Sequence, residues 1–130
     1  MCAIAPTTGS DLEQVQPCVL CVDDSQEILE INQTILQAAG YQVLTARCGE
    51  AALELLHFRS VEVAIVDNVM PEMNGIDLAR RIKSSDAGTI VVMYSGTVRE
   101  NEKIPFVDAF LYKGKGPLAL RDLVVSLLNK

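Results

Sequence analysis

Short apolar runs alternate along the chain with stretches in which apolar residues recur every three or four positions. The runs are nearly all apolar and rich in β-branched side chains, which is typical of buried strands. They lie at residues 18–22, 41–46, 61–66, 89–94 and 109–112. The other stretches follow the period of a helix and lie at residues 26–39, 50–58, 75–84 and from 117 onward, with a short one near 98–103. Such an alternation predicts an α/β fold, a doubly wound five-stranded parallel sheet with helices on both faces.

The segment before the first strand has a different character. Residues 1–16 contain Pro6, Gly9 and Ser10 and show no periodicity, so we expect a flexible N-terminal leader. Residues 17–130 are then expected to form one domain, since 130 residues are enough for a single core.

The first helix shows how ends and faces are predicted. Ser25 is suited to cap its N-terminus, and Gly40 is suited to end it. The isoleucines Ile28, Ile31 and Ile35 follow the helical spacing, so we expect them to face the sheet.

Composition and charge narrow the classes of function. The formal net charge is −6 and the pI is about 4.7, so we expect no direct binding of nucleic acid, whose phosphates an acidic domain cannot neutralise. No apolar run approaches the roughly 20 residues that a membrane-spanning helix needs, and the N-terminus has no secretory signal pattern. We therefore expect no membrane association.

Two of the four cysteines, Cys18 and Cys21, have the C-x-x-C spacing of redox and zinc motifs. In a strand, however, residues three apart point to opposite faces, and no second pair exists to complete a zinc site. We interpret both as buried strand residues. Free thiols without a targeting signal predict a cytoplasmic protein.

Polar residues follow four of the predicted strands directly. They are Asp23 and Asp24, Asp67, Ser95, and Lys113. Because the carboxyl ends of parallel strands meet at one edge of the sheet, we expect these side chains to lie together. Clustered carboxylates favour a divalent cation such as Mg²⁺, Mn²⁺ or Ca²⁺. A cation, a lysine and a nucleophilic carboxylate are the groups that phosphoryl transfer onto an aspartate requires.

The motifs around these residues resemble the receiver domain of two-component response regulators, the CheY-like family. The most specific motif, at residues 66–75, reads Val-Asp-Asn-Val-Met-Pro-Glu-Met-Asn-Gly. The others are Val22-Asp23-Asp24-Ser25, Tyr94-Ser95-Gly96 and Phe110-Leu111-Tyr112-Lys113. The resemblance spans residues 17–130 and implies a flavodoxin-like sheet with the strand order 2-1-3-4-5.

The resemblance also implies roles for individual residues. It implies that Asp67 is the phosphoacceptor and that Mg²⁺ is bound by Asp24, by Asp67, by the backbone carbonyl of Val69 and, through water, by Asp23. Ser95 and Lys113 are implied to contact the phosphoryl group. Phe110 and Ser95 are implied to form the switch. The turn signals at Asn74 and Gly75 suit a tight loop after Asp67, and we expect one of the two residues to adopt a positive φ.

The chain departs from the family pattern after the fourth strand. Gly114 follows Lys113 where the family usually has a proline in a cis bond, so a trans bond is expected. The segment between Ser95 and Lys113 is about one helical turn shorter than usual, which predicts a shortened fourth helix. This helix forms much of the family's dimer surface, so we expect a monomer or a weak dimer.

The implied function is a phosphorylation-dependent signalling switch. Its phosphoryl donor is a sensor histidine kinase or a histidine phosphotransfer protein, because the one histidine, His57, has no partners in its segment. The chain is then no enzyme in the ordinary sense, since it catalyses only its own phosphotransfer and autodephosphorylation, and it signals to a downstream protein of unknown identity.

Two alternatives remain open. One is a receiver-like interaction module that is not phosphorylated. The other is a small Mg²⁺-dependent phosphatase of the haloacid-dehalogenase type, which needs a second aspartate where this chain has Val69.

Overall fold

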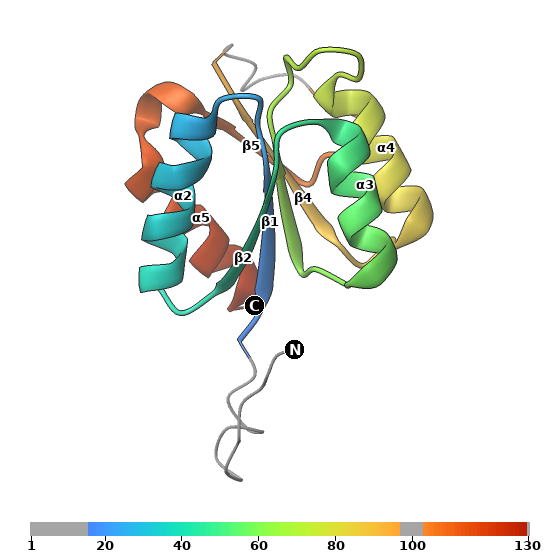
Figure 1. Cartoon of the computed structure of the whole chain (residues 1–130). Helices are drawn as coiled ribbons and strands as arrows, with labels where there is room; N and C mark the ends of the chain where they lie inside the picture. The colour runs from blue at the N-terminus through green and yellow to red at the C-terminus, as the bar shows by residue number, and fades with distance from the viewer. Residues whose placement is uncertain (1–15, 97–102, 130) are drawn as a thin grey trace, which may run out of the picture.

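One parallel sheet forms the centre of the molecule. The computed structural model describes residues 16–96 and 103–129. Its strands are β1 (Cys18–Val22), β2 (Gln42–Ala46), β3 (Val63–Val66), β4 (Ile90–Ser95) and β5 (Ala109–Tyr112). They pair in parallel in the order β2-β1-β3-β4-β5, which confirms the predicted strand order (Figure 1).

Helices cover both faces of the sheet, as predicted. They are α2 (Gln26–Ala38), α3 (Gly49–Phe58), α4 (Gly75–Ser85) and α5 (Pro117–Leu128), with the short 3₁₀ turn η1 (Lys113–Lys115) before α5. Figure 1 shows α2 and α5 on one face and α3 and α4 on the other. None of the described helices is long and apolar enough to cross a membrane.

Two predicted segments lie outside the residues that the structure describes. The short helix expected near 98–103 lies almost wholly within residues 97–102, and the leader at 1–16 lies almost wholly within residues 1–15, outside the described parts of the chain.

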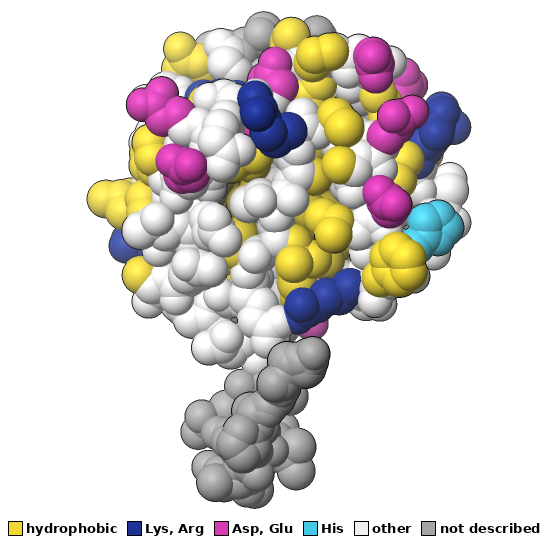
Figure 2. All heavy atoms as spheres, in the orientation of Figure 1, with side chains coloured by type: hydrophobic (Ala, Val, Ile, Leu, Met, Phe, Trp, Pro, Cys, Tyr) yellow, Lys and Arg dark blue, Asp and Glu magenta, His cyan; other side chains and the backbone are white. Residues whose placement is uncertain are grey.

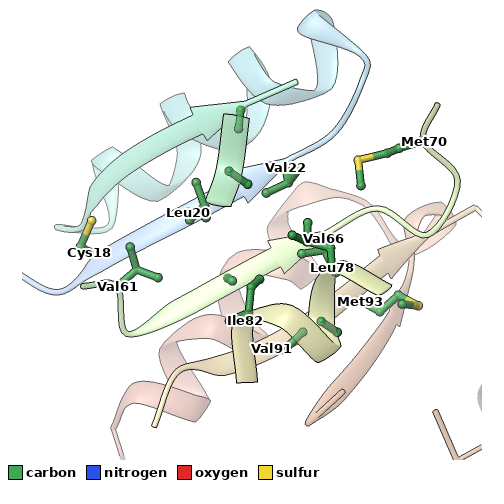
Figure 3. Close-up of a cluster of buried hydrophobic side chains, with 14 residues drawn as sticks. Cys18, Leu20, Val22, Val61, Val66, Met70, Leu78, Ile82, Val91 and Met93 are labelled. Atoms are coloured by element: carbon green, nitrogen blue, oxygen red, sulfur yellow. The ribbon is translucent and has the colours of Figure 1, made fainter. Parts of the chain in front are cut away.

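The sheet separates two buried apolar clusters. Along β1 the side chains alternate between them: Leu20 and Val22 pack toward α3 and α4 (Figure 3), and Val19 packs toward α2 and α5. Cys18 and Cys21 lie in opposite clusters, so the interpretation of both as buried strand residues is confirmed. Burial raises the pKa of the Cys21 thiol to about 12, and it therefore stays protonated.

The predicted inner face of α2 is only partly confirmed, because Ile28 packs, partly buried, against the cluster under α2 and α5. The buried residues of the helix are Leu29, Asn32 and Leu36, whereas Ile31 is 44% exposed. Both sets of residues follow the helical period, and successive residues differ by only about 100° around the axis, so spacing alone does not separate the two faces. The predicted cap is confirmed, because the Ser25 hydroxyl accepts a hydrogen bond from the Ile28 N–H at 3.3 Å.

The one histidine, His57, is exposed near the end of α3, as expected for a residue without a ligand role (cyan in Figure 2). Acidic and basic side chains are interspersed on the face that Figure 2 shows, and the residues described there form no extended basic surface.

An ion pair joins α4 to the start of β5. The Asp108 carboxylate lies 2.6 Å from the Lys83 ammonium and accepts a hydrogen bond from the Val91 N–H at 2.8 Å. The same ammonium donates to the Thr89 carbonyl at 2.8 Å. Asp108 therefore ties the segment before β5 to both β4 and α4.

We expect Asp108→Asn to lower the free energy of unfolding by about 1 kcal/mol, because a charge-assisted bond to a half-exposed carboxylate is weakened. Urea unfolding measures this loss. Asp122→Asn is the matched control, since Asp122 pairs with its neighbour Arg121 at an exposed position and its replacement should change stability by less than about 0.5 kcal/mol. Equal losses in the two variants would show that the Lys83–Asp108 pair contributes no more to stability than the exposed Arg121–Asp122 pair.

Candidate functional site

Three carboxylates gather at the carboxyl edge of the sheet. Asp23 and Asp24 follow β1, Asp67 follows β3, and one oxygen from each lies within 4.8 Å of the others. Asp23 and Asp67 are buried and Asp24 is exposed. The structure thus brings together the acidic residues that the sequence placed at strand ends, at the upper edge of the sheet in Figure 1.

Backbone hydrogen bonds fix this cluster. The Asp23 N–H donates to the Ala46 carbonyl at 3.1 Å, and its carboxylate accepts from the Ser25 N–H at 2.9 Å. The Asp67 N–H donates to the Val22 carbonyl at 3.0 Å. The cluster therefore continues the parallel ladders of β1 with β2 and with β3, which makes its geometry a direct product of the sheet.

Lys113 supplies the positive charge. Its ammonium lies 2.7 Å from one Asp23 oxygen and 3.4 Å from one Asp67 oxygen, and 5.9 Å from the centre of the Tyr94 ring. Burial alone would lower the pKa of Lys113, but the hydrogen bond and charge of Asp23, together with Asp67, outweigh it and raise the pKa. The lysine therefore stays charged between the two buried carboxylates.

The proposed nucleophile is held in an unfavourable place for a negative charge. Burial, and then the neighbouring charge of Asp23, raise the pKa of Asp67, against the opposing effects of Lys113 and of the Val69 N–H, which donates to Asp67 at 3.4 Å. A cation bound to the cluster would lower this electrostatic cost of the ionised Asp67 carboxylate. The all-oxygen donor set suits a hard divalent cation such as Mg²⁺.

This raised pKa has a consequence for stability. The folded protein holds the Asp67 proton more tightly than the unfolded chain does, so protonation of Asp67 stabilises the fold. This stabilisation is complete below the ordinary pKa of 3.8 and is lost as the pH rises through the raised pKa of the folded state. We expect Asp67→Asn, which keeps a neutral side chain, to be more stable than the parent at neutral pH without metal. Thermal unfolding across the acidic range should show this advantage shrinking as the pH falls; an advantage that grows instead contradicts the assignment.

Ser95 and Phe110 lie on the two strands beyond β3. Ser95 ends β4 and is fully buried, and its register partner in β5 is Tyr112. Phe110 lies in β5 opposite Met93 and packs, partly buried, against the cluster under α3 and α4. The hydroxyl is thus at the carboxyl edge, and the aromatic ring lies further back along the neighbouring strand.

The loop after Asp67 is fixed by close packing at Gly75. A Cβ atom at Gly75 would lie 2.5 Å from the Asp67 carbonyl oxygen and 2.8 Å from the Asn68 Cα. The Gly75 N–H also donates to the Asn68 carbonyl at 3.0 Å. The start of α4 therefore packs directly against the backbone of Asp67 and Asn68.

The expected positive φ at Asn74 or Gly75 is wrong. Glu72 takes the left-handed conformation instead, with φ 71°. Asn74 has φ −79° and caps α4, its side-chain oxygen accepting from the Asp77 N–H at 2.8 Å. Turn propensity marked the correct loop, but Asn74 is occupied as a cap and Gly75 is needed for its small size.

Some contacts at the site had no signal in the sequence. Arg47 donates from its guanidinium to the Asp24 carbonyl at 3.1 Å, and the Tyr94 ring lies beside Lys113. Both partners come from separate parts of the chain, so only the fold reveals these pairs. The Lys113–Gly114 bond is trans, as expected, like every other peptide bond that the structure describes.

Comparison with known proteins identifies the family. The family model for the response regulator receiver domain matches residues 19–113. The chain therefore belongs to the response regulator receiver domain family.

Individual relatives agree. The response regulator SaeR of Staphylococcus epidermidis is 31% identical over 115 residues, which are 85% of this chain and 48% of SaeR. SaeR of Staphylococcus aureus is 30% identical over 115 residues, 85% of this chain and 49% of that protein. The chain thus spans about half the length of these relatives.

Solved structures show the same fold. The chemotaxis protein CheY4 of Vibrio cholerae has a TM-score of 0.79 at 27% identity, covering 86% of this chain and 98% of CheY4. The response regulator TrrA of Thermotoga maritima, solved in complex with Mg²⁺ and a beryllium fluoride, has a TM-score of 0.79 at 25% identity, covering 86% of this chain and 99% of TrrA.

Proposed function

We propose that this chain is a phosphorylation-dependent signalling switch whose phosphoacceptor is Asp67. One observation carries the proposal: Asp67 is buried within an acidic cluster and contacts a charged lysine, at the strand edge where parallel sheets bind ligands. Membership of the receiver family supports it, because response regulators work with histidine kinases.

The proposed cation is Mg²⁺. Asp24 and Asp67 would bind it directly, Asp23 through water, and Val69 through its backbone carbonyl. When bound, the cation would offset negative charge on the transferring phosphoryl oxygens. The all-oxygen cluster of the described residues and the Mg²⁺ complex of the similar TrrA support this assignment.

The proposed reaction is a direct displacement. One carboxylate oxygen of Asp67 attacks the phosphorus of a phosphohistidine on a histidine kinase or histidine phosphotransfer protein. The new O–P bond forms as the P–N bond breaks, and the bonding pair leaves with the imidazole nitrogen. Lys113, already 3.4 Å from Asp67, would then pair with a phosphoryl oxygen, and the Ser95 hydroxyl would donate to another.

The proposed output follows from the same contacts. A hydrogen bond from Ser95 to the phosphoryl group would draw the end of β4 toward Asp67, and Phe110 on the neighbouring strand would turn inward. The surface presented to a downstream protein would thereby change. We place this switch in one domain over residues 17–130, acting as a monomer or weak dimer through protein contacts.

The cellular setting is part of the proposal. Cys18, Cys21 and Cys48 are free thiols, which supports a reducing compartment such as the cytoplasm. The net charge of −6 supports protein partners rather than nucleic acid.

Beryllofluoride binding tests the proposal against a receiver-like module that carries no phosphate. In ¹⁵N-labelled protein, beryllofluoride with Mg²⁺ should shift the amide signals of Asp67, Ser95 and Lys113, and a chelator should reverse the shifts. Protein with beryllofluoride alone is the control, because the cluster would lack its cation. Unchanged spectra at saturating beryllofluoride and Mg²⁺ would favour the unphosphorylated module.

A further inference from the structure

The turn that carries Lys113 is built around a tyrosine ring seated on a glycine. A Cβ atom at Gly114 would lie 2.8 Å from the Tyr112 Cζ and 3.0 Å from its Cδ2, with Cε2 closer still. No real side chain approaches a ring so closely. Gly114 therefore leaves the space that the Tyr112 ring occupies, and the two residues flank Lys113 on either side.

The backbone closes the turn on its far side. Lys113 begins η1, and the Gly116 N–H donates to its carbonyl at 3.0 Å. Gly116 itself has φ 91°, a conformation that favours glycine, and α5 begins at the next residue. The turn is thus short and rich in glycine.

The Tyr112 ring has no evident role in the core. Its neighbours Phe110 and Leu111 pack against the two apolar clusters, but Tyr112 belongs to neither cluster among the described residues, although it is half-buried. Its backbone pairs with Ser95 at the end of β4. Tyr112 is therefore fixed to the sheet by its backbone, while its ring contacts the turn that follows β5.

We propose that Tyr112 is a positioning residue, whose ring, seated on Gly114, sets the direction from which Lys113 reaches the phosphoacceptor. This inference rests on the proposed function of Lys113. The ammonium must lie near both carboxylates, at the 2.7 Å and 3.4 Å now observed, and it sits at the end of a long side chain. A small displacement of the backbone at Gly114 therefore changes these distances substantially, and misplacements of about 1 Å at such sites are costly.

Variants at the two positions separate this role from general stability. Gly114→Ala should displace the ring or the turn and weaken beryllofluoride binding in the presence of Mg²⁺ by about tenfold, since a charge-assisted contact is lost. Tyr112→Phe keeps the ring and should bind within about twofold of the parent. Tyr112→Ala should weaken binding, and adding Gly114→Ala to Tyr112→Ala should cause no further loss, because the clash is gone.

A second readout does not depend on phosphoryl chemistry. In free protein labelled with ¹⁵N-lysine, the Lys113 Nζ signal should move in Gly114→Ala toward that of a solvent-exposed lysine and stay in place in Tyr112→Phe. Thermal unfolding checks that each variant is folded. If Gly114→Ala does not fold, Tyr112→Ala and Tyr112→Phe decide the matter with both readouts.

Several results would overturn the positioning role. They are parent-like binding and an unmoved Lys113 signal in folded Gly114→Ala, equal losses in Tyr112→Phe and Tyr112→Ala, and additive losses in the double variant. Failure of the parent itself to bind beryllofluoride would instead contradict the proposed function, and the Lys113 signal would still test the role of Tyr112.

Discussion

Replacing Asp67 with asparagine is expected to abolish covalent labelling of the protein by acetyl phosphate and Mg²⁺. The amide keeps the size and burial of the side chain but lacks the anionic oxygen that attacks phosphorus. The other carboxylates of the cluster are poor substitutes. Asp23 is hydrogen-bonded to the Ser25 N–H and paired with Lys113, and Asp24 is exposed. The loss should therefore reach the detection limit of a radiolabel assay.

A matched carboxylate outside the site provides the control. Asp86 follows α4 as its C-cap, is exposed, and accepts a hydrogen bond from the Gly88 N–H at 2.9 Å. Asp86→Asn should be labelled at the parent's rate. Persistent labelling of Asp67→Asn would refute Asp67 as the phosphoacceptor, whatever the behaviour of the control.

Replacing Gly75 with alanine is expected to damage both the fold and the site. The new methyl group would lie 2.5 Å from the Asp67 carbonyl oxygen and 2.8 Å from the Asn68 Cα. These are backbone atoms with little freedom to move, so the free energy of unfolding should fall by about 3 kcal/mol. In the fraction that remains folded, displacement of the Asp67 backbone should slow labelling by acetyl phosphate by at least about tenfold.

Gly96→Ala is the matched control for this glycine. Gly96 also adjoins the site, directly after Ser95, but a Cβ atom there would meet no atom of the described residues within 4 Å. Its stability in urea should stay within about 0.5 kcal/mol of the parent. If Gly75→Ala were as stable as Gly96→Ala, the loop after β3 would be able to move and accommodate the methyl group. That result would contradict the close packing of Gly75 against the backbone of Asp67 and Asn68.

The sheet and the strand-end cluster could be predicted from the sequence, because both follow from local patterns. Apolar runs such as residues 18–22 define the strands, and a parallel sheet necessarily brings their carboxyl ends to one edge. Asp23, Asp67 and Lys113 therefore lie together wherever the fold forms. The structure adds the detail that the Lys113 ammonium lies closer to Asp23 than to Asp67.

The features that could not be predicted depend on tertiary packing. Leu36 and Ile35 both fit the helical period of α2, and only docking on the sheet decides that Leu36 is buried. Glu72 has no propensity for a positive φ, and it adopts one because the loop must close between Asp67 and α4. The departure at Gly114 was visible in the sequence, but its partner, the Tyr112 ring, was not.

Mass spectrometry of the parent protein tests the central claim most directly. After incubation with acetyl phosphate and Mg²⁺, the intact protein should gain the mass of one phosphoryl group, and peptide mapping should place that group on Asp67. Omitting Mg²⁺ or adding a chelator should prevent the gain. No gain in mass with Mg²⁺ present, or a phosphoryl group mapped to another residue, would contradict the assignment of Asp67 as the phosphoacceptor of this receiver domain.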